Sequence, residues 1–371
     1  MKTNTGNNCL TGAKIKMEVK VYSEAEVNDV PGFKKNREKL PFVFLEGHAT
    51  HIRKSGQGEW FLFGSMDNRK FVPVRKFKSK FLTQIQILHA PLAEGKPMKG
   101  KDEREFMEVV LDKIRKEGIA DRVCQPPTHV VFKSPPRGSI DCGFGTWYLT
   151  LEGISETLLW EGLHGKHRNV IRNAKKQGVE IRIGRDQLDA FYALYQATMK
   201  RSEMHCESFS YFQEYFDSHG SRNVICAVAY SKGIPQGALL IPHTEYAAYY
   251  VYGASADRMD VNGAVNYLHW EVILKMKALN VKRYDFVGAR LSSTEGSRLA
   301  GIQQFKERFG SVLERGILWK TDIRELKCRM YDSVLKCYLW MRKIHLSGDI
   351  IDQERRKTAG ERKAVAGREE I

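Results

Sequence analysis

The sequence predicts an α+β protein of two domains, with mixed, mostly antiparallel sheets flanked by helices. The first observation is length, since 371 residues exceed the roughly 250–300 that one hydrophobic core usually spans. The second is composition: 42% hydrophobic and 28% charged residues are typical of globular proteins and exclude collagen, a coiled-coil rod or wholesale disorder. The third is the order of elements in the second half, where hairpin-linked strands separate helices, which excludes a doubly wound parallel sheet.

The N-terminal part predicts a strand-rich domain. Residues 1–17 are polar and small, so we expect them to be disordered, followed by a first domain over residues 18–150. Apolar runs between Gly and polar turns indicate its strands. These runs are residues 41–47, 59–65, 70–81, 128–133 and 146–153. One helix is expected over residues 104–117, where apolar residues recur at helical spacing and Gly118 follows.

The rest of the chain predicts a second domain over residues 151–323, followed by a two-part tail. Its expected helices are residues 158–178, 186–201, 210–216, 262–279 and 302–310. Its expected strands are residues 179–184, 223–230, 237–244, 246–254, 283–288 and 312–320. In the tail, residues 324–347 predict an amphipathic basic helix. Residues 348–371 have dense charge and few apolar side chains, which predicts disorder.

The charge balance indicates the class of partner. Lys and Arg number 60 against 44 acidic residues, a formal charge of +16. This excess suggests nucleic acid, an anionic membrane or a phosphorylated molecule, and the alternative is a basic surface kept for solubility. The seven cysteines form no CxxC pair, so neither a disulfide framework nor a zinc site is expected. With no signal peptide or membrane span recognised, we expect a cytoplasmic protein.

Two clusters of basic residues are candidates for substrate binding. In the first, Lys76, Lys78 and Lys80 alternate along a strand, so their side chains project from one face. In the second, Arg168 and Arg172 share one side of the basic helix. Like charges on one face repel unless an anion neutralises them. We therefore predict phosphate contacts at Lys76, Lys78, Arg168 and Arg172; the alternative is a solvated edge strand and a solvated helix face.

Common catalytic signatures are absent from the sequence. It contains no GxxxxGK[ST], GxSxG or HExxH motif and no strand–GxGxxG–helix pattern. Its eleven histidines are scattered, and their spacing supports no catalytic triad. P-loop chemistry and metal catalysis are therefore disfavoured, and no metal or resident cofactor is expected.

A series of short motifs runs through residues 150–320. They are the basic helix before the strand VEI, the strand end YGAS (252–255), Trp270 and Glu271, Tyr284, Asp285, Phe286 and Gly288 (YDF-x-G), and Phe305, Lys306, Phe309 and Gly310 (FKxxFG). In this order and spacing they resemble the FemABX-type transferases. These enzymes build the peptidoglycan interpeptide bridge and consist of two domains of the GNAT N-acyltransferase superfamily. The resemblance implies two tandem GNAT-like domains, of which the first is degenerate.

The resemblance also implies an activity. Such enzymes pass an amino acid from aminoacyl-tRNA to an amine on a cell-wall precursor, so the expected partners are aminoacyl-tRNA and a phosphorylated or lipid-linked glycan or peptide. By match, Phe305 and Lys306 lie at the reaction centre, where Lys306 stabilises an oxyanion or holds the tRNA end. The alternative is that the phenylalanines are core residues and Lys306 faces water.

Three further residues are site candidates within the resemblance. Asp285 lies near the end of a buried strand, where a carboxylate is costly unless paired, so it is a general base or a structural partner of Lys or Arg. Tyr252 lines an acceptor channel or packs in the sheet. Arg290 lies in a polar loop that meets a substrate or is simply exposed.

The sequence also bears on the donor, on two alternative functions and on the tail helix. Acetyl-CoA enzymes of the superfamily carry an [RQ]xxGx[GA] loop, whereas Arg258 has no Gly three residues later, which favours aminoacyl-tRNA over acyl-CoA. An acyl-CoA-dependent N-acyltransferase of surface polysaccharide synthesis and a non-catalytic nucleic-acid-binding protein remain alternatives. The tail helix contacts an anionic membrane or packs on the second domain. We expect a monomer.

Overall fold

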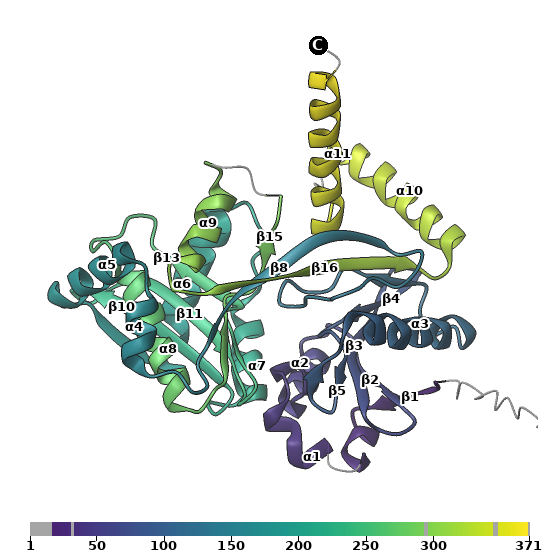
Figure 1. Cartoon of the computed structure of the whole chain (residues 1–371), viewed down its shortest axis with the longest axis horizontal. Coiled ribbons are helices and arrows are strands. Elements are labelled where there is room, and N and C mark those ends of the chain that lie inside the picture. The colour runs from purple at the N-terminus through teal and green to yellow at the C-terminus, as the bar shows by residue number, and fades with distance from the viewer. Residues whose placement is uncertain (1–16, 31–32, 293–295, 344–347, 370–371) are drawn as a thin grey trace, which may run out of the picture.

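The chain folds into two halves joined by a long two-stranded ribbon (Figure 1). The computed structural model describes residues 17–30, 33–292, 296–343 and 348–369. The expected disorder of residues 1–16 lies outside this range. We call residues 17–133 the first half and residues 151–311 the second half. The ribbon consists of β8 (Ile140–Thr150) and β16 (Val312–Asp322), which pair antiparallel along nine positions. The α+β class with mixed, mostly antiparallel sheets is confirmed.

One large sheet runs through the ribbon from the first half to the second. In spatial order it contains β1 (Val19–Ser23), β2 (Glu59–Ser65), β3 (Lys70–Ser79), β4 (Leu82–Ile87), β7 (Arg122–Cys124), β16, β8, β14 (Arg283–Asp285) and β12 (Ala248–Tyr249). The short strands β5 (Leu92–Ala93), β6 (Lys96–Pro97) and β15 (Ala289–Arg290) join it at the sides. Only β4–β7 and β12–β14 are parallel pairs among the ladders described.

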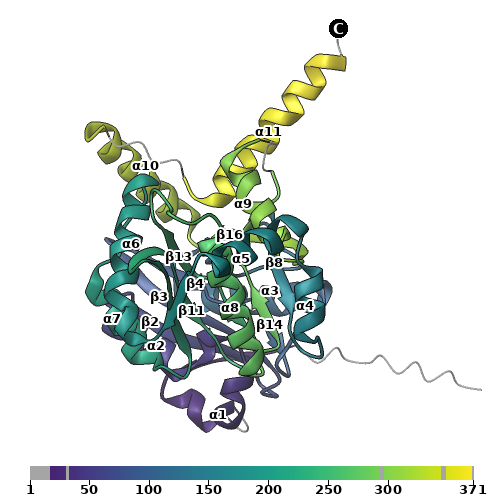
Figure 2. The same ribbon diagram turned by 90° about the vertical axis from the view of Figure 1, so that its left-hand side faces the viewer.

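The second half adds a separate four-stranded sheet. Its order is β13 (Tyr252–Ser255), β11 (Ile234–Pro242), β10 (Val224–Ser231) and β9 (Glu180–Ile183). Every residue of β10 is buried because helices cover both faces of the sheet. Figure 2 shows these layers. On one side lie α4 (Glu156–Gly162), α5 (Gly165–Lys176) and α8 (Ala264–Ala278); on the other lie α6 (Leu188–Arg201) and α7 (Phe209–His219).

The two sheets separate within a single predicted strand. Residues 246–254 form two strands instead of one: β12 pairs parallel with β14 in the large sheet, and β13 pairs antiparallel with β11 in the small one. The chain changes sheets at Tyr250 and Val251. The α9 helix (Arg298–Glu307) and the loop after β14 lie beside this divergence (Figure 1).

Two strands predicted for the first half are wrong. Residues 41–47 form the 3-10 helix η3 (Phe42–Phe44) and the start of α2 (Glu46–Lys54). Phe42, Val43 and Phe44 are all buried, and a short buried apolar run fits a strand or a helix equally well. Residues 128–133 form no strand and make a single bridge, from Phe132 to Ile317. The other short helices are η1 (Glu26–Asp29), α1 (Phe33–Asn36), η2 (Arg37–Lys39) and η4 (Arg185–Gln187), whereas α3 (Gly100–Lys116) matches the predicted helix.

The tail differs from its prediction in two ways. The basic helix α10 (Glu325–Met341) is present, but it packs on the first half through the buried Cys328, whose thiol donates to the carbonyl of Asp121 over 3.3 Å. The predicted disorder of residues 348–371 is wrong for α11 (Ile350–Glu369). Ile351 is fully buried beside the ribbon, and Glu354 is 2% exposed against Arg290, so two anchors suffice to order a polar helix.

Candidate functional site

The loop that follows β14 is the centre of the candidate site. Asp285 holds it from one side and is itself only 2% exposed. Its Oδ1 accepts hydrogen bonds from the backbone N–H of Val287, over 2.8 Å, and from the hydroxyl of Thr146. Its Oδ2 accepts from the guanidinium of Arg283 over 2.7 Å. These contacts favour the structural reading of Asp285, since both carboxylate oxygens already accept hydrogen bonds from the protein.

Lys306 holds the same loop from the other side. Its ammonium donates to the carbonyl of Gly288, over 2.8 Å, and to that of Val287. Both residues have positive φ, 46° for Val287 and 52° for Gly288, and a β-branched residue rarely adopts such a backbone. Lys306 is 6% exposed, so the reading in which it faces water is wrong. Burial lowers the pKa of Lys306 to about 8, and Asp285 opposes this shift.

Phe305 belongs to an aromatic cluster where the two sheets diverge. Its ring lies 5.4 Å from that of His167 and 5.5 Å from that of His269. The Nε2–H of His167 donates to the carbonyl of Phe305 over 3.1 Å, which ties α5 to α9. Burial lowers the pKa of His167 to about 4 and that of His269 to about 3, so both imidazoles are neutral. Phe305 therefore fixes the position of Lys306 through packing.

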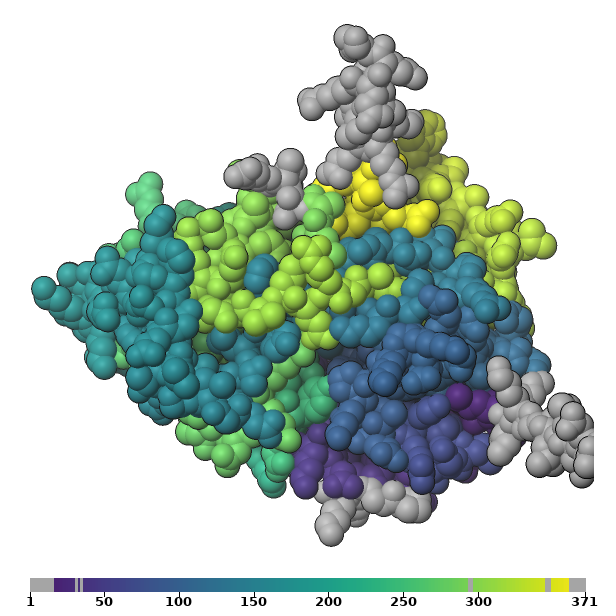
Figure 3. All heavy atoms as spheres, viewed as in Figure 1, coloured from purple at the N-terminus to yellow at the C-terminus, as the bar shows by residue number. Residues whose placement is uncertain are grey.

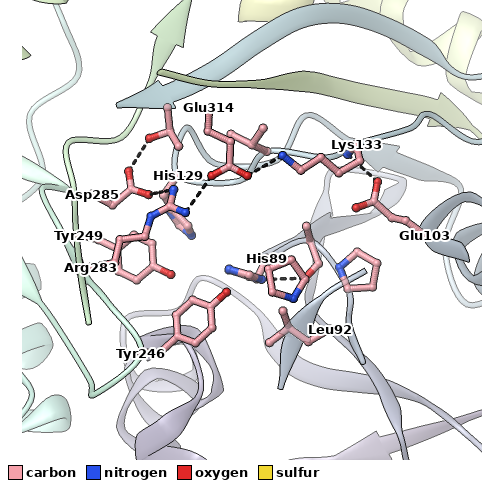
Figure 4. A pocket seen from close by; sticks show the side chains of 15 residues that line it. His89, Leu92, Glu103, His129, Lys133, Tyr246, Tyr249, Arg283, Asp285 and Glu314 are labelled. Carbon is pink, nitrogen blue, oxygen red and sulfur yellow. Dashed lines mark hydrogen bonds and ion pairs between the residues drawn. The ribbon is translucent and has the colours of Figure 1, made fainter. Parts of the chain in front are cut away.

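A small cavity adjoins Asp285 where the two halves meet (Figure 4). It measures about 50 Å³, which is room for a few waters or the end of a side chain rather than a whole precursor. A chain of ion pairs crosses it: Lys133 to Glu314 at 2.5 Å, Glu314 to Arg283 at 2.8 Å, and Arg283 to Asp285. Burial opposes the charge of Arg283, but Asp285 and Glu314 raise its pKa above the ordinary value.

The first half supplies the other wall of this cavity. His89 donates from Nδ1 to the carbonyl of Ala90 over 2.7 Å, and His129 donates from Nε2 to that of Leu88 over 2.9 Å. Burial lowers both imidazole pKa values to about 4. Burial also raises the pKa of Glu103 to about 7, against the two backbone amides that donate to it. We call the whole contact surface between the first and second halves, including this cavity and its ion pairs, the seam.

The sequence reasoning missed most of the seam. Arg283, Glu314 and Lys133 are charged residues inside expected strands, and that position is the signal that could have marked them. Their partners are distant in the sequence: Lys133 and Glu314 are 181 residues apart. Among the described residues no group of three or more His, Cys, Asp or Glu side chains is placed to hold a metal ion.

The remaining predicted residues are not brought to one site. Tyr252 shares a 2.8 Å hydrogen bond with the hydroxyl of Tyr211 in another aromatic cluster. Arg290 pairs with Glu354 of α11 at 2.5 Å, and Arg168 donates to carbonyls of Glu161 and Leu163 at the end of α4. The two basic clusters lie at opposite ends of the molecule, with α5 at one end and β3 and β4 near the other (Figure 1).

Arg172 lines a larger groove on the outer face of the second half. The groove has a volume of about 440 Å³ and lies between α4, α5 and α8. The guanidinium of Arg172 lies 5.3 Å from the ring centre of Trp160, and that ring lies 5.1 Å from that of Trp270. Lys76, in contrast, lies over Phe61 and pairs with Glu59 at 3.4 Å.

The chain is similar to known proteins in sequence over the second half and in fold over most of its length. The family model of the FemAB family matches residues 145–232 and 229–317, which contain Asp285, Lys306 and the loop they hold. The crystal structure of FemX aligns at a TM-score of 0.62 and 14% identity, over 85% of this chain and 99% of FemX. The C-terminal domain of a proposed lysylphosphatidylglycerol synthetase from Agrobacterium fabrum aligns at 0.51 and 11%, over 84% and 97%.

The structural matches establish the fold, and the family match applies to residues 145–317. No protein of curated function is similar enough in sequence to match. The alignment with FemX covers 85% of this chain and 99% of FemX, so it extends into the first half beyond the matched segment. The predicted resemblance is confirmed by the family match, and an aminoacyl- or acyltransferase is the corresponding enzyme class. Residues 145–317, which carry Asp285 and Lys306, match the FemAB family.

Proposed function

We propose that this protein transfers an aminoacyl group from aminoacyl-tRNA to an amine on a cell-wall or cell-surface precursor. The observation that carries the proposal is the position of Lys306. It lies in the FKxxFG motif of the FemAB match and is held, nearly buried, on the loop after β14. Formation of a peptidoglycan bridge amide is the activity that the family supports most directly.

The chemistry is the attack of an amine on an ester, which needs stabilisation of a tetrahedral oxyanion. An ammonium has three N–H donors, and Lys306 gives one to Val287 and one to Gly288. We assign the third to the oxyanion. Since burial lowers its pKa to about 8, the residue is charged at neutral pH and loses its proton just above it. The acceptor amine must also lose a proton, because an ordinary lysine-type amine has a pKa near 10.4.

The start of α8 supports aminoacyl-tRNA over acyl-CoA as donor. A pyrophosphate is held by N–H donors at a helix N-terminus. Here Gly263 precedes α8 with φ of 94°, and a Cβ added to it would lie 2.3 Å from the carbonyl oxygen of Val170 in α5. Gly263 is thus packed tightly against α5, and the segment before α8 lacks the [RQ]xxGx[GA] pattern of the superfamily's pyrophosphate loop.

A transfer assay tests this proposal. The purified chain is incubated with a lysine-containing cell-wall precursor and, in separate reactions, with charged tRNA, with acyl-CoA or with buffer. We expect a mass increase of one aminoacyl group on the acceptor only with charged tRNA. Transfer only from acyl-CoA would show that acyl-CoA is the donor, and the proposed amide formation would stand. Binding of tRNA without transfer to any nucleotide-linked or lipid-linked acceptor would favour the non-catalytic alternative.

A further inference from the structure

The outer face of α10 carries a continuous apolar stripe. Its members recur at intervals of four, four, three and four residues, so they lie on one side of the helix over about 22 Å. They are Leu326, Met330, Val334, Cys337 and Met341. The exposed fractions are 77% for Leu326, 67% for Met330 and 64% for Met341, and Trp340 beside them is 79% exposed. Scattered exposed apolar residues are ordinary, but an aligned set of this length marks a binding surface.

The opposite face of α10 contacts the first half through Cys328 and two ion pairs. Lys327 pairs with Asp121 at 2.7 Å, and Asp332 pairs with Arg122 at the same distance. Cys328 is completely buried between them. The stripe therefore does not pack on the second domain, which was one of the two readings of this helix. Figure 3 shows the C-terminal elements along the upper edge of the first half.

The first basic cluster lies beside this stripe. The turn between β3 and β4 brings Phe81, which is 47% exposed, to a ring distance of 5.3 Å from Tyr331 of α10. Lys80 lies 4.9 Å from the ring centre of Tyr338. Two features that are about 250 residues apart in the sequence thus form one surface. Exposed cations border it on both sides: Lys78 and Lys80 from the turn, and Arg329, Lys336, Arg342 and Lys343 from the helix and its end.

The acids near this surface are already paired. Glu325 lies 3.1 Å from Arg329, and Asp332 is held by Arg122. The surface therefore combines a long apolar face, an exposed Trp and flanking Lys and Arg side chains. This combination is typical of a helix that lies in the interface of an anionic bilayer, with its apolar face among the acyl chains and its cations at the phosphates. Apart from Arg329, the cations of the border lie outside these pairs, and a second copy of this basic chain would repel them rather than neutralise them.

We propose that α10 and the β3–β4 turn form a docking surface for an anionic lipid bilayer. The surface holds the protein at the membrane peripherally, since no helix among the described residues is both long and apolar enough to cross one. It would raise the local concentration of any acceptor anchored there. The inference is independent of the transfer chemistry, because bilayer binding is measured with vesicles that contain neither donor nor acceptor.

Vesicle co-sedimentation of the full chain tests the proposal. We expect binding to vesicles of phosphatidylcholine mixed with phosphatidylglycerol and at least tenfold weaker binding to phosphatidylcholine alone. The combined variant Leu326→Gln, Met330→Gln and Met341→Gln should lose at least tenfold in affinity for the mixed vesicles. Its matched control is Met66→Gln, Met204→Gln and Ile234→Gln, whose side chains are 61%, 63% and 56% exposed elsewhere on the surface. The control should bind as the parent does.

The charged border is tested in the same assay. Lys78→Gln, Lys80→Gln and Lys336→Gln should each weaken binding about fivefold, whereas the exposed Lys101→Gln and Lys232→Gln should not. Absence of vesicle binding would overturn the proposal, as would equal binding to neutral and mixed vesicles. A concentration-dependent dimer that the stripe variant abolishes, without vesicle binding by the parent, would assign the stripe to a second copy and overturn the proposal as well.

Discussion

The seam and the outer face of α10 differ in which side chains they shield from solvent and which they expose. At the seam, titratable side chains are paired or kept neutral, and the ion pairs run from the exposed Lys133 through the half-buried Glu314 and Arg283 to the buried Asp285. On α10, apolar side chains are exposed beside cations on the surface. The difference teaches where substitutions should act. Changes at the seam should alter the stability of the molecule, whereas changes on α10 should alter what it binds.

Acid should affect the seam most strongly. Burial lowers the imidazole pKa of eight histidines, several of which lie at the seam, such as His48 and His219, whose ring nitrogens are 3.2 Å apart. The eight are His48, His51, His89, His129, His167, His219, His243 and His269. Because the folded pKa lies below the unfolded value of about 6.5, each contributes stability that is present above pH 6.5 and lost as pH falls.

The expected effect of acid is large. Each buried imidazole costs about 1 kcal/mol of unfolding free energy over the first pH unit below 6.5, so together they approach the whole stability of a typical domain. Urea denaturation at a series of pH values measures the slope. His219→Gln should reduce the slope by about one proton, and His205→Gln, at an exposed side chain, should not. A stability that stays level from pH 7 to pH 5 would contradict this account.

The next effect concerns the ion pairs of the seam. Asp285→Asn removes the buried carboxylate and leaves the half-buried guanidinium of Arg283 with one partner fewer, so we expect a loss of about 3 kcal/mol in unfolding free energy. Its control is Asp257→Asn, which breaks the exposed pair with Arg201 and should cost less than about 1 kcal/mol. Similar losses in the two variants, measured by urea denaturation, would show that burial is not what gives the Asp285 pair its strength.

Lys306 has a stabilising role in the fold and, in our proposal, a role in the transfer reaction. Lys306→Met removes both donors from the Val287 and Gly288 carbonyls, so unfolding free energy should fall by about 1–2 kcal/mol. Loss of the third donor should lower kcat by roughly 10²–10³. The parent's kcat should decline above pH 8, where Lys306 loses its proton, and this decline should vanish in the variant. A variant that keeps the same decline would leave Lys306 with a structural role only.

The smallest effect is expected on α10. The combined Leu326→Gln, Met330→Gln and Met341→Gln variant changes side chains with few internal contacts, so unfolding free energy should shift by less than about 0.5 kcal/mol. Thermal melting without lipid measures it. A loss of several kcal/mol would mean that the stripe packs within the molecule, and it would remove the contrast with the seam.

The sequence predicted the elements whose periodicity is strong, such as β10, β11 and α3. The sequence did not predict the elements whose conformation depends on a few specific tertiary contacts. The apolar run at residues 41–47 is helical although it is buried like the strand β10, so its burial could not have told the two apart, and α11 is anchored by Ile351 and Glu354. At the site, the motifs marked Asp285 and Lys306, but not the partners that reach them from other elements. The direction of Lys306, inward onto two carbonyls, depends on a backbone that no local pattern specifies.

The place of β16 in the large sheet has a consequence for how the molecule is made. β16 lies between β7 and β8, yet it is among the last strands to be synthesised. Until residue 322 has left the ribosome, β7 has β4 on one side but no strand on the other, so the edge of the sheet in the first half stays open. An open edge pairs readily with other chains. The first half is therefore complete only after β16 has been synthesised. A chain that stops before β16 should aggregate rather than accumulate as a folded half.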